Sequence, residues 1–295
     1  MFAPPPPPSA VTIPAAAPTT LEAAFAAARL SARRVSAPES VLTGDASVDD
    51  KLAALDAIQS KIPDEPKAAK IADLNALTAA AGADGQPPEV RARALTYAGY
   101  AMNQVEDDAS RSKALTVLIA ALKLPAYRIF ALRGFGPAAH GTPKADEARY
   151  QGALLDLLDG NVSGEERETA LVALFSFVST KDDLSKRSPA LVADLDKRLL
   201  GPIESDPARF VADPRFTAGA RAMAAAILWS SARHRETSGS AAAGTRVHAL
   251  LVKLCALETD PTALGWMTTY RDAAPSKPAK PGVKRKRRTD GAGDH

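Results

Sequence analysis

Residue types that carry out enzyme and metal chemistry are sparse in this sequence. The single cysteine, Cys255, excludes an intramolecular disulfide and any site that needs several thiolates. None of the four histidines belongs to a dense metal-ligand pattern such as H-E-x-x-H. His248 and Cys255 share one face of a predicted helix, but about 10.5 Å of helix axis separates them, too far for a thiolate–imidazole pair. We therefore expect no catalytic residues, no metal site and no cofactor.

A glycine-rich stretch at 133–142, RGFGPAAHGT, comes closest to a phosphate-binding loop. Such loops follow a strand and lead directly into a helix, whereas here a helix precedes the glycines and Pro137 follows them. We expect Gly134 and Gly136 to end a helix and form a loop instead.

Three acidic residues and two tryptophans also have structural explanations. Glu165, Glu166 and Glu168 follow Ser163, a pattern typical of a helix start with a capping box. Trp229 and Trp266 could stack on a ligand, but as lone aromatics on apolar helix faces they are expected in the core.

The most conspicuous motif is a basic run near the end of the chain, PGVKRKRR at 281–288. Its charged residues are Lys284, Arg285, Lys286, Arg287 and Arg288. They could contact nucleic-acid phosphates without sequence preference, act as a localisation signal, or only solvate the tail. No aromatic residue accompanies them, which argues against a dedicated single-strand site. The surrounding segment, 273–295, is expected to be disordered.

The elements that would position any site are helical. Apolar residues recur with a 3.6-residue period from Ser47 onward, and no stretch alternates long enough for a strand. Polar residues followed by proline, as in Asp206-Pro207 and Asp260-Pro261, mark helix starts. We predict a loop at 36–47 and a polar linker at 234–245. The class is all-α, with about a dozen short helices.

An internal repeat accompanies these helices. The pattern R-x-x-A-L begins at Arg91, Arg111, Arg128, Arg167 and Arg246. Its spacing fits single helices and helix pairs, and 47–272 has room for five to six pairs of about 39 residues. We expect the alanine and leucine to fill a seam between helices, with the arginine stem along it and the charged head in water.

This combination of helix pairs, proline-punctuated starts and R-x-x-A-L seams resembles the HEAT and armadillo-like α-solenoid superfamily. The resemblance is to the general architecture and covers about 47–272. It implies a curved superhelix of a kind that mostly binds other proteins, although a minority bind nucleic acid and a few modify DNA bases. It supplies no catalytic residue.

The sequence thus divides into three parts. Residues 1–46 are a Pro/Ala-rich region with one possible helix at 21–35, residues 47–272 are the helical-repeat domain, and 273–295 is the tail. The tail carries seven basic and two acidic residues, so the rest of the chain has a net charge of −2 although the whole has +3. The body is not basic.

We expect a non-enzymatic scaffold that binds an unidentified protein partner. The alternative is a nucleic-acid-associated protein that makes weak, non-specific phosphate contacts through the tail. No run of apolar residues is long enough to span a membrane. The expected compartment is cytoplasmic, or nuclear in a eukaryotic or viral setting, and a processed secreted form stays open. The sequence does not predict the oligomeric state.

Overall fold

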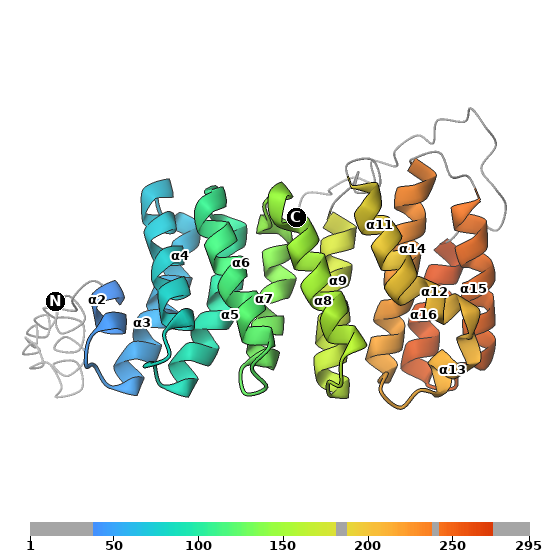
Figure 1. Cartoon of the computed structure of the whole chain (residues 1–295), viewed down its shortest axis with the longest axis horizontal. Coiled ribbons are helices and arrows are strands. Elements are labelled where there is room, and N and C mark those ends of the chain that lie inside the picture. The colour runs from blue at the N-terminus through green and yellow to red at the C-terminus, as the bar shows by residue number, and fades with distance from the viewer. Residues whose placement is uncertain (1–37, 181–187, 238–241, 274–295) are drawn as a thin grey trace, which may run out of the picture.

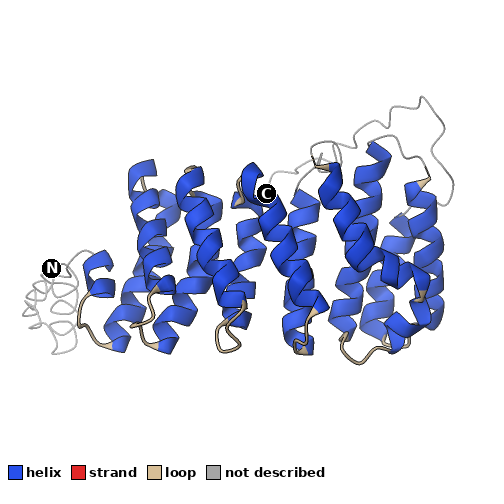
Figure 2. Cartoon of the chain, viewed as in Figure 1, coloured by secondary structure: helices blue, strands red, loops and turns tan. Residues whose placement is uncertain are grey.

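The computed structural model describes residues 38–180, 188–237 and 242–273. Throughout these ranges the regular elements are helices and none is a strand, which confirms the all-α class (Figure 2). The elements are α2 (Pro38–Thr43), α3 (Val48–Lys61), η1 (Ile62–Asp64), α4 (Lys67–Gly82), α5 (Pro88–Gln104), α6 (Asp108–Leu122), α7 (Arg128–Gly141), η2 (Lys144–Asp146), α8 (Glu147–Asp159), α9 (Gly164–Thr180), α11 (Pro189–Leu195), the π-helical turn η3 (Asp196–Leu200), α12 (Gly201–Ser205), α13 (Pro207–Ala212), α14 (Ala218–Thr237), α15 (Ala243–Leu257) and α16 (Pro261–Ala273).

The helices stack in two layers along the long axis of the molecule (Figure 1). Layer A consists of α3, α5, α7, α9, α14 and α16, each packed on the next. Layer B consists of α2, α4, α6, α8, the broken segment α11–α13, and α15, and it faces the viewer in Figure 1. Neighbours touch extensively along layer A and much less along layer B. Openings lie between several pairs of layer B neighbours.

Glycines set the close spacing in layer A. A Cβ added to Gly99 of α5 would collide with the Gly134 carbonyl of α7, and one added to Gly134 would lie 2.7 Å from the Leu95 carbonyl oxygen. The predicted loop at Gly134 and Gly136 is therefore wrong: both lie inside α7, as does Pro137. Gly134 serves helix packing and so remains in the helix despite its low helix propensity, whereas a Cβ added to Gly136 would meet nothing within 4 Å.

The repeated arginines cap helix ends. Each of four reaches from the first turn of its helix to a carbonyl in the last turn of the preceding one: Arg91 Nε to Ala81 O at 3.0 Å, Arg111 Nε to Met102 O at 3.1 Å, Arg128 Nε to Leu122 O at 2.8 Å, and Arg167 Nη1 to Leu158 O at 2.5 Å. These carbonyls lie in the last turn, where the helix supplies no N–H partner, and they form the negative end of the helix dipole.

The expectation that these arginine heads lie in water is therefore wrong for four of the five. The Arg111 side chain is 19% exposed, and Arg167 as a whole residue is 1% exposed. The paired Ala and Leu of those four motifs are buried as expected. Arg246 differs, because its side chain is 62% exposed and bonds Glu204, and its motif alanine, Ala249, is exposed. Within the described residues, the fifth match shares the sequence pattern without a bond to a helix-end carbonyl.

Several predicted helix starts are confirmed. Ser47 caps α3, Asp206 caps α13, and Asp260 accepts the backbone N–H of Ala263 in α16. Ser163 and Glu166 form a reciprocal capping box, with Ser163 N donating to Glu166 Oε2 at 2.8 Å and Glu166 N to Ser163 Oγ at 3.2 Å. The glutamates at the start of α9 therefore have the predicted structural role.

Three other local predictions are wrong. Part of the predicted loop at 36–47 is the short helix α2. The Leu42 side chain, which is 2% exposed, anchors this helix in the hydrophobic core. The predicted linker at 234–245 is shorter, since α14 continues to Thr237 and α15 begins at Ala243. Trp266 is 48% exposed instead of lying in the core, because it faces outward from the last helix of layer A.

Candidate interaction grooves

The basic run singled out in the sequence lies outside the described residues. This applies to Lys284, Arg285, Lys286, Arg287 and Arg288, and equally to the possible helix at 21–35. The three uses considered for the run remain predictions.

His248 and Cys255, the reactive side chains considered above, contact different residues and not each other. His248 Nδ1 lies 3.0 Å from the Arg271 carbonyl oxygen, and Cys255 Sγ lies 3.9 Å from Thr268 Oγ1. Over the described ranges, no group of three or more His, Cys, Asp or Glu side chains is arranged to hold a metal ion.

One open groove lies between α6 and α8 of layer B. Its cavity has a volume of about 430 Å³, within the range of about 300–1,000 Å³ typical of ligand sites. Ile119 and Leu122 of α6 and Leu157 of α8 supply much of the apolar wall. Gly152 of α8 also lines it, and a Cβ added there would meet nothing within 4 Å. The groove is open because α6 and α8 make few contacts with each other and because a glycine occupies one wall.

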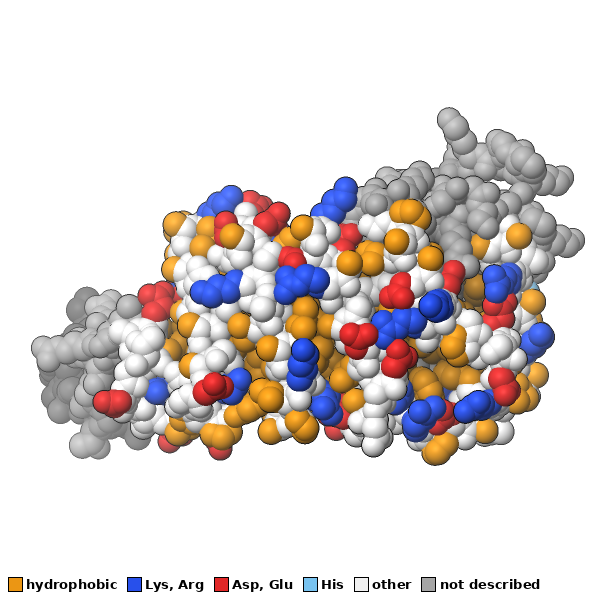
Figure 3. Space-filling model, in the orientation of Figure 1, with side chains coloured by type: hydrophobic (Ala, Val, Ile, Leu, Met, Phe, Trp, Pro, Cys, Tyr) orange, Lys and Arg blue, Asp and Glu red, His pale blue; other side chains and the backbone are white. Residues whose placement is uncertain are grey.

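Charged side chains border this groove. Arg149 is committed to Asp146, with Nη1 2.5 Å from Oδ1, and Asp156 accepts from Arg198 at 2.8 Å. Lys123, which ends α6, is exposed and makes no ion pair with any described residue. The groove therefore combines an apolar wall with one uncompensated positive charge. Figure 3 views this face, where hydrophobic side chains lie among Lys, Arg, Asp and Glu.

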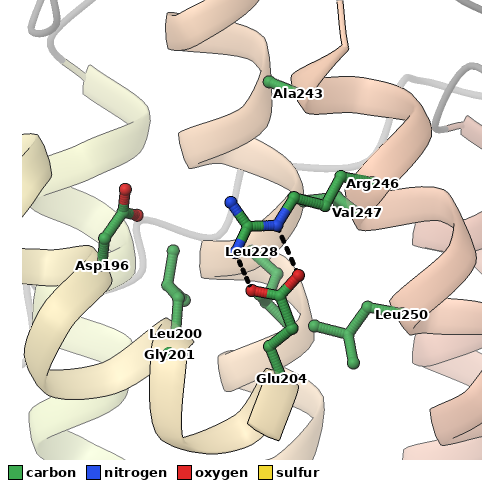
Figure 4. A pocket seen from close by; sticks show the side chains of 9 residues that line it. All are labelled: Asp196, Leu200, Gly201, Glu204, Leu228, Ala243, Arg246, Val247 and Leu250. Carbon is green, nitrogen blue, oxygen red and sulfur yellow. Dashed lines mark hydrogen bonds and ion pairs between the residues drawn. The ribbon is translucent and has the colours of Figure 1, made fainter.

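Two further openings lie between neighbouring layer B elements. One of about 450 Å³, between α2 and α4, has an alanine-rich wall that includes Ala72 and Ala76. The other, of about 90 Å³, lies between α12 and α15 (Figure 4). There Arg246 of α15 reaches across to an ion pair with Glu204 of α12. The ion pair bridges two layer B elements over a small apolar gap.

An aromatic ladder covers part of the end of the stack at α14 and α16. Tyr270 lies between the two tryptophans, with ring centroids 5.6 Å from Trp229 and 6.1 Å from Trp266. Arg233 places its guanidinium 4.8 Å from the centroid of the Trp229 ring. The contacts within the ladder explain its position without a ligand.

Asp73 is a buried carboxyl with a raised pKa. Asp73 of α4 is 0% exposed and lies 3.1 Å from Lys61 Nζ, which also contacts Glu65 at 3.1 Å. Burial, followed by the hydrogen bond to the neighbouring Glu65 carboxyl, raises the pKa of Asp73 to about 6, although Lys61 acts in the opposite direction. This cluster links the end of α3 to α4 and lines none of the openings described above.

Sequence reasoning missed the grooves. Ile119 and Leu157 belong to apolar stripes that predict a core, and periodicity does not distinguish a core position from a groove wall. Gly152 within a leucine-rich helix was the one available signal, because glycine in a helix interior needs a packing or functional reason.

Comparison of the chain with protein-family models, with curated proteins and with solved structures found no match. Within the described ranges, no helix combines the length and apolar character needed to cross a bilayer. Function is therefore inferred from the surfaces described above.

Proposed function

We propose that this chain is a non-enzymatic protein-interaction scaffold, and that its α6/α8 groove receives an amphipathic helical segment of another protein. The segment would place apolar side chains in the groove and an acidic side chain beside Lys123. The observation that carries the proposal is the groove itself, with its apolar wall and with Lys123, which forms no ion pair with a described residue.

A helix-in-groove mode fits this geometry. Such recognition uses apolar anchors at i, i+3, i+4 and i+7 that enter a groove lined by apolar side chains. The groove between α6 and α8 is bordered by two helices, and the open position at Gly152 gives an incoming side chain room next to the α8 backbone. Lys123 then favours segments with Asp or Glu at the edge of the apolar stripe.

The test uses matched glycine substitutions. Gly152→Leu extends a side chain into the groove, while Gly265→Leu changes α16 of layer A, where an added Cβ also meets nothing within 4 Å. Both replace a helical glycine, so each should preserve folding and stabilise its helix by up to about 1 kcal/mol. The two variants differ mainly in whether the groove is filled.

Helical peptides selected by display on the full chain provide the ligands, and fluorescence polarisation measures their affinities. We expect enrichment of apolar residues at helical spacing beside Asp or Glu. Gly152→Leu should weaken binding at least about tenfold, a loss of about 1.4 kcal/mol, and Gly265→Leu should not. Lys123→Glu should weaken binding of the acidic peptides. Equal affinities for the wild type and Gly152→Leu would contradict the proposal.

A further inference from the structure

The arginines of the repeated motif differ in their counter-charges. Arg91, Arg111 and Arg128 each have a carboxylate oxygen nearby, at 3.0 Å in Asp84, 3.5 Å in Asp108 and 3.3 Å in Glu166. Arg246 is paired with Glu204. Arg167 is the most buried of the five, at 1% exposed, yet no carboxylate of the described residues lies within 4 Å of its guanidinium. Among the described residues, Arg167 is therefore the motif arginine with no carboxylate at contact distance.

The contacts of Arg167 only partly compensate its charge. Its Nη1 and Nη2 donate to the carbonyls of Leu158 and Gly160 at 2.5 and 3.1 Å, and its guanidinium lies 5.1 Å from the centroid of the Phe216 ring. Its Nε is buried without a hydrogen-bond partner. Burial, followed by the nearby positive charge of Arg215, lowers the pKa of Arg167, although the carboxylates of Asp213 and Asp159 act in the opposite direction. A buried charge of this kind is costly unless it is paired.

A cavity of about 390 Å³ adjoins this guanidinium. Arg167 shares its lining with Arg198, Arg209 and Arg215, and three aspartates, Asp159, Asp206 and Asp213, also line it. Arginines outnumber carboxylates there. Phe210 and Phe216 form an apolar part of the wall, with ring centroids 4.9 Å apart in an edge-on arrangement. The cavity thus offers both positive charge and apolar surface.

Two of the four arginines that line the cavity are paired with its aspartates. Arg198 Nη2 lies 2.6 Å from Asp159 Oδ2, and Arg215 Nη2 lies 2.6 Å from Asp213 Oδ2. Asp206 accepts the backbone N–H of Arg209 at 2.9 Å, while the exposed Arg209 side chain makes no ion pair with a described residue. Arg167 and Arg209 therefore supply positive charge that no carboxylate of the described residues neutralises at contact distance.

We propose that this cavity binds a small phosphate monoester. Its anionic group supplies the counter-charge that carboxylates supply to the other motif arginines, and its organic body packs on Phe210 and Phe216. Guanidinium groups present planar forks of donors that match phosphate oxygens. The apolar wall favours an ester with an aromatic or aliphatic body over free phosphate. This proposal is independent of the α6/α8 groove.

Calorimetric titration of the full chain with phenyl phosphate and with inorganic phosphate tests it. Arg209→Gln is the informative variant, because Arg209 is exposed and its loss leaves no buried partner. The matched control is Arg93→Gln, an exposed arginine of α5 that pairs with Asp56 outside the cavity. Arg93→Gln should bind phenyl phosphate as the wild type does, and Arg209→Gln about tenfold more weakly, as expected for a lost charge-assisted hydrogen bond.

The titrations also separate the two parts of the proposal. Phenyl phosphate should bind more tightly than inorganic phosphate, and it should raise the melting temperature of the wild type more than that of Arg209→Gln. Three results would overturn the proposal: no saturable binding of phenyl phosphate, equal affinity for the wild type and Arg209→Gln, or equal affinity for the two phosphates.

Discussion

Replacing Arg111 by methionine isolates the capping role of the repeated arginines. Methionine keeps an apolar stem along the seam but cannot donate a hydrogen bond. The substitution removes the 3.1 Å bond from Nε to the Met102 carbonyl, at a side chain that is 19% exposed. Its ion-pair partner, Asp108, has a side chain that is 76% exposed, so little of the effect should come from that pair.

The expected loss follows from these contacts. A hydrogen bond from a charged donor contributes about 1.5–3 kcal/mol, and a positive charge at a helix C-terminus adds about 0.3–1 kcal/mol. Because the side chain is slightly exposed, we expect Arg111→Met to lower the free energy of unfolding by about 2–3 kcal/mol. Arg246→Met is the matched control, since this motif arginine forms an exposed ion pair and bonds no backbone carbonyl of the described residues. Its loss should be below about 1 kcal/mol.

Equilibrium urea unfolding followed by circular dichroism measures both variants. The two losses should differ by at least about 1 kcal/mol, with slopes of the unfolding curve close to that of the wild type. Equal losses in the two variants would refute the reasoning, because the sequence motif would then matter more than the capping contact. A loss below about 0.5 kcal/mol in Arg111→Met would refute it as well.

Three further predictions concern pH, packing and the tail. The folded-state pKa of Asp73 is about 6 against an ordinary value of 3.8, so its contribution to stability is complete below about pH 4 and is lost as pH rises through 6, by at most about 3 kcal/mol. Asp73→Asn should reduce this loss in urea unfolding measured across pH, and an unchanged pH profile would contradict the assignment. Gly99→Ala should lower the free energy of unfolding by about 3 kcal/mol because of the Gly134 carbonyl, whereas Gly136→Ala, which meets nothing within 4 Å, should raise it by up to about 1 kcal/mol. Equal effects in thermal melts would be inconsistent with the close packing of α5 on α7. If the tail contacts nucleic acid, truncation after residue 272 should abolish most of the salt-dependent binding of duplex DNA, and an unchanged titration would exclude that role.

Many of the helices can be predicted from signals that are local in the sequence. The 3.6-residue period and capping residues such as Ser47 and Asp260 locate helices because they act within one or two turns. Helix α2 could not be predicted in this way, since it has only six residues and Leu42 is its one buried residue. Such a short helix is held by tertiary contacts rather than by its own propensity.

The candidate sites depend on contacts between distant residues. Gly134 belongs to a helix because α5 approaches it closely, and no residue near it in the sequence indicates that neighbour. Arg111 and Arg246 share a motif, but only the structure distinguishes a cap from an exposed ion pair. In four cases the R-x-x-A-L pattern identified arginines that lie between neighbouring helices. It placed their guanidinium groups in water, whereas they bond helix-end carbonyls.

The most direct test of the proposed scaffold role is a methyl NMR titration of the full chain with a display-selected acidic amphipathic peptide. We expect the largest chemical-shift changes at Ile119, Leu122 and Leu157, which line the α6/α8 groove, and no change at Val172 of layer A, which is 41% exposed. Shifts that centre on Val172, or an absence of shifts at the groove methyls on saturation, would contradict the account.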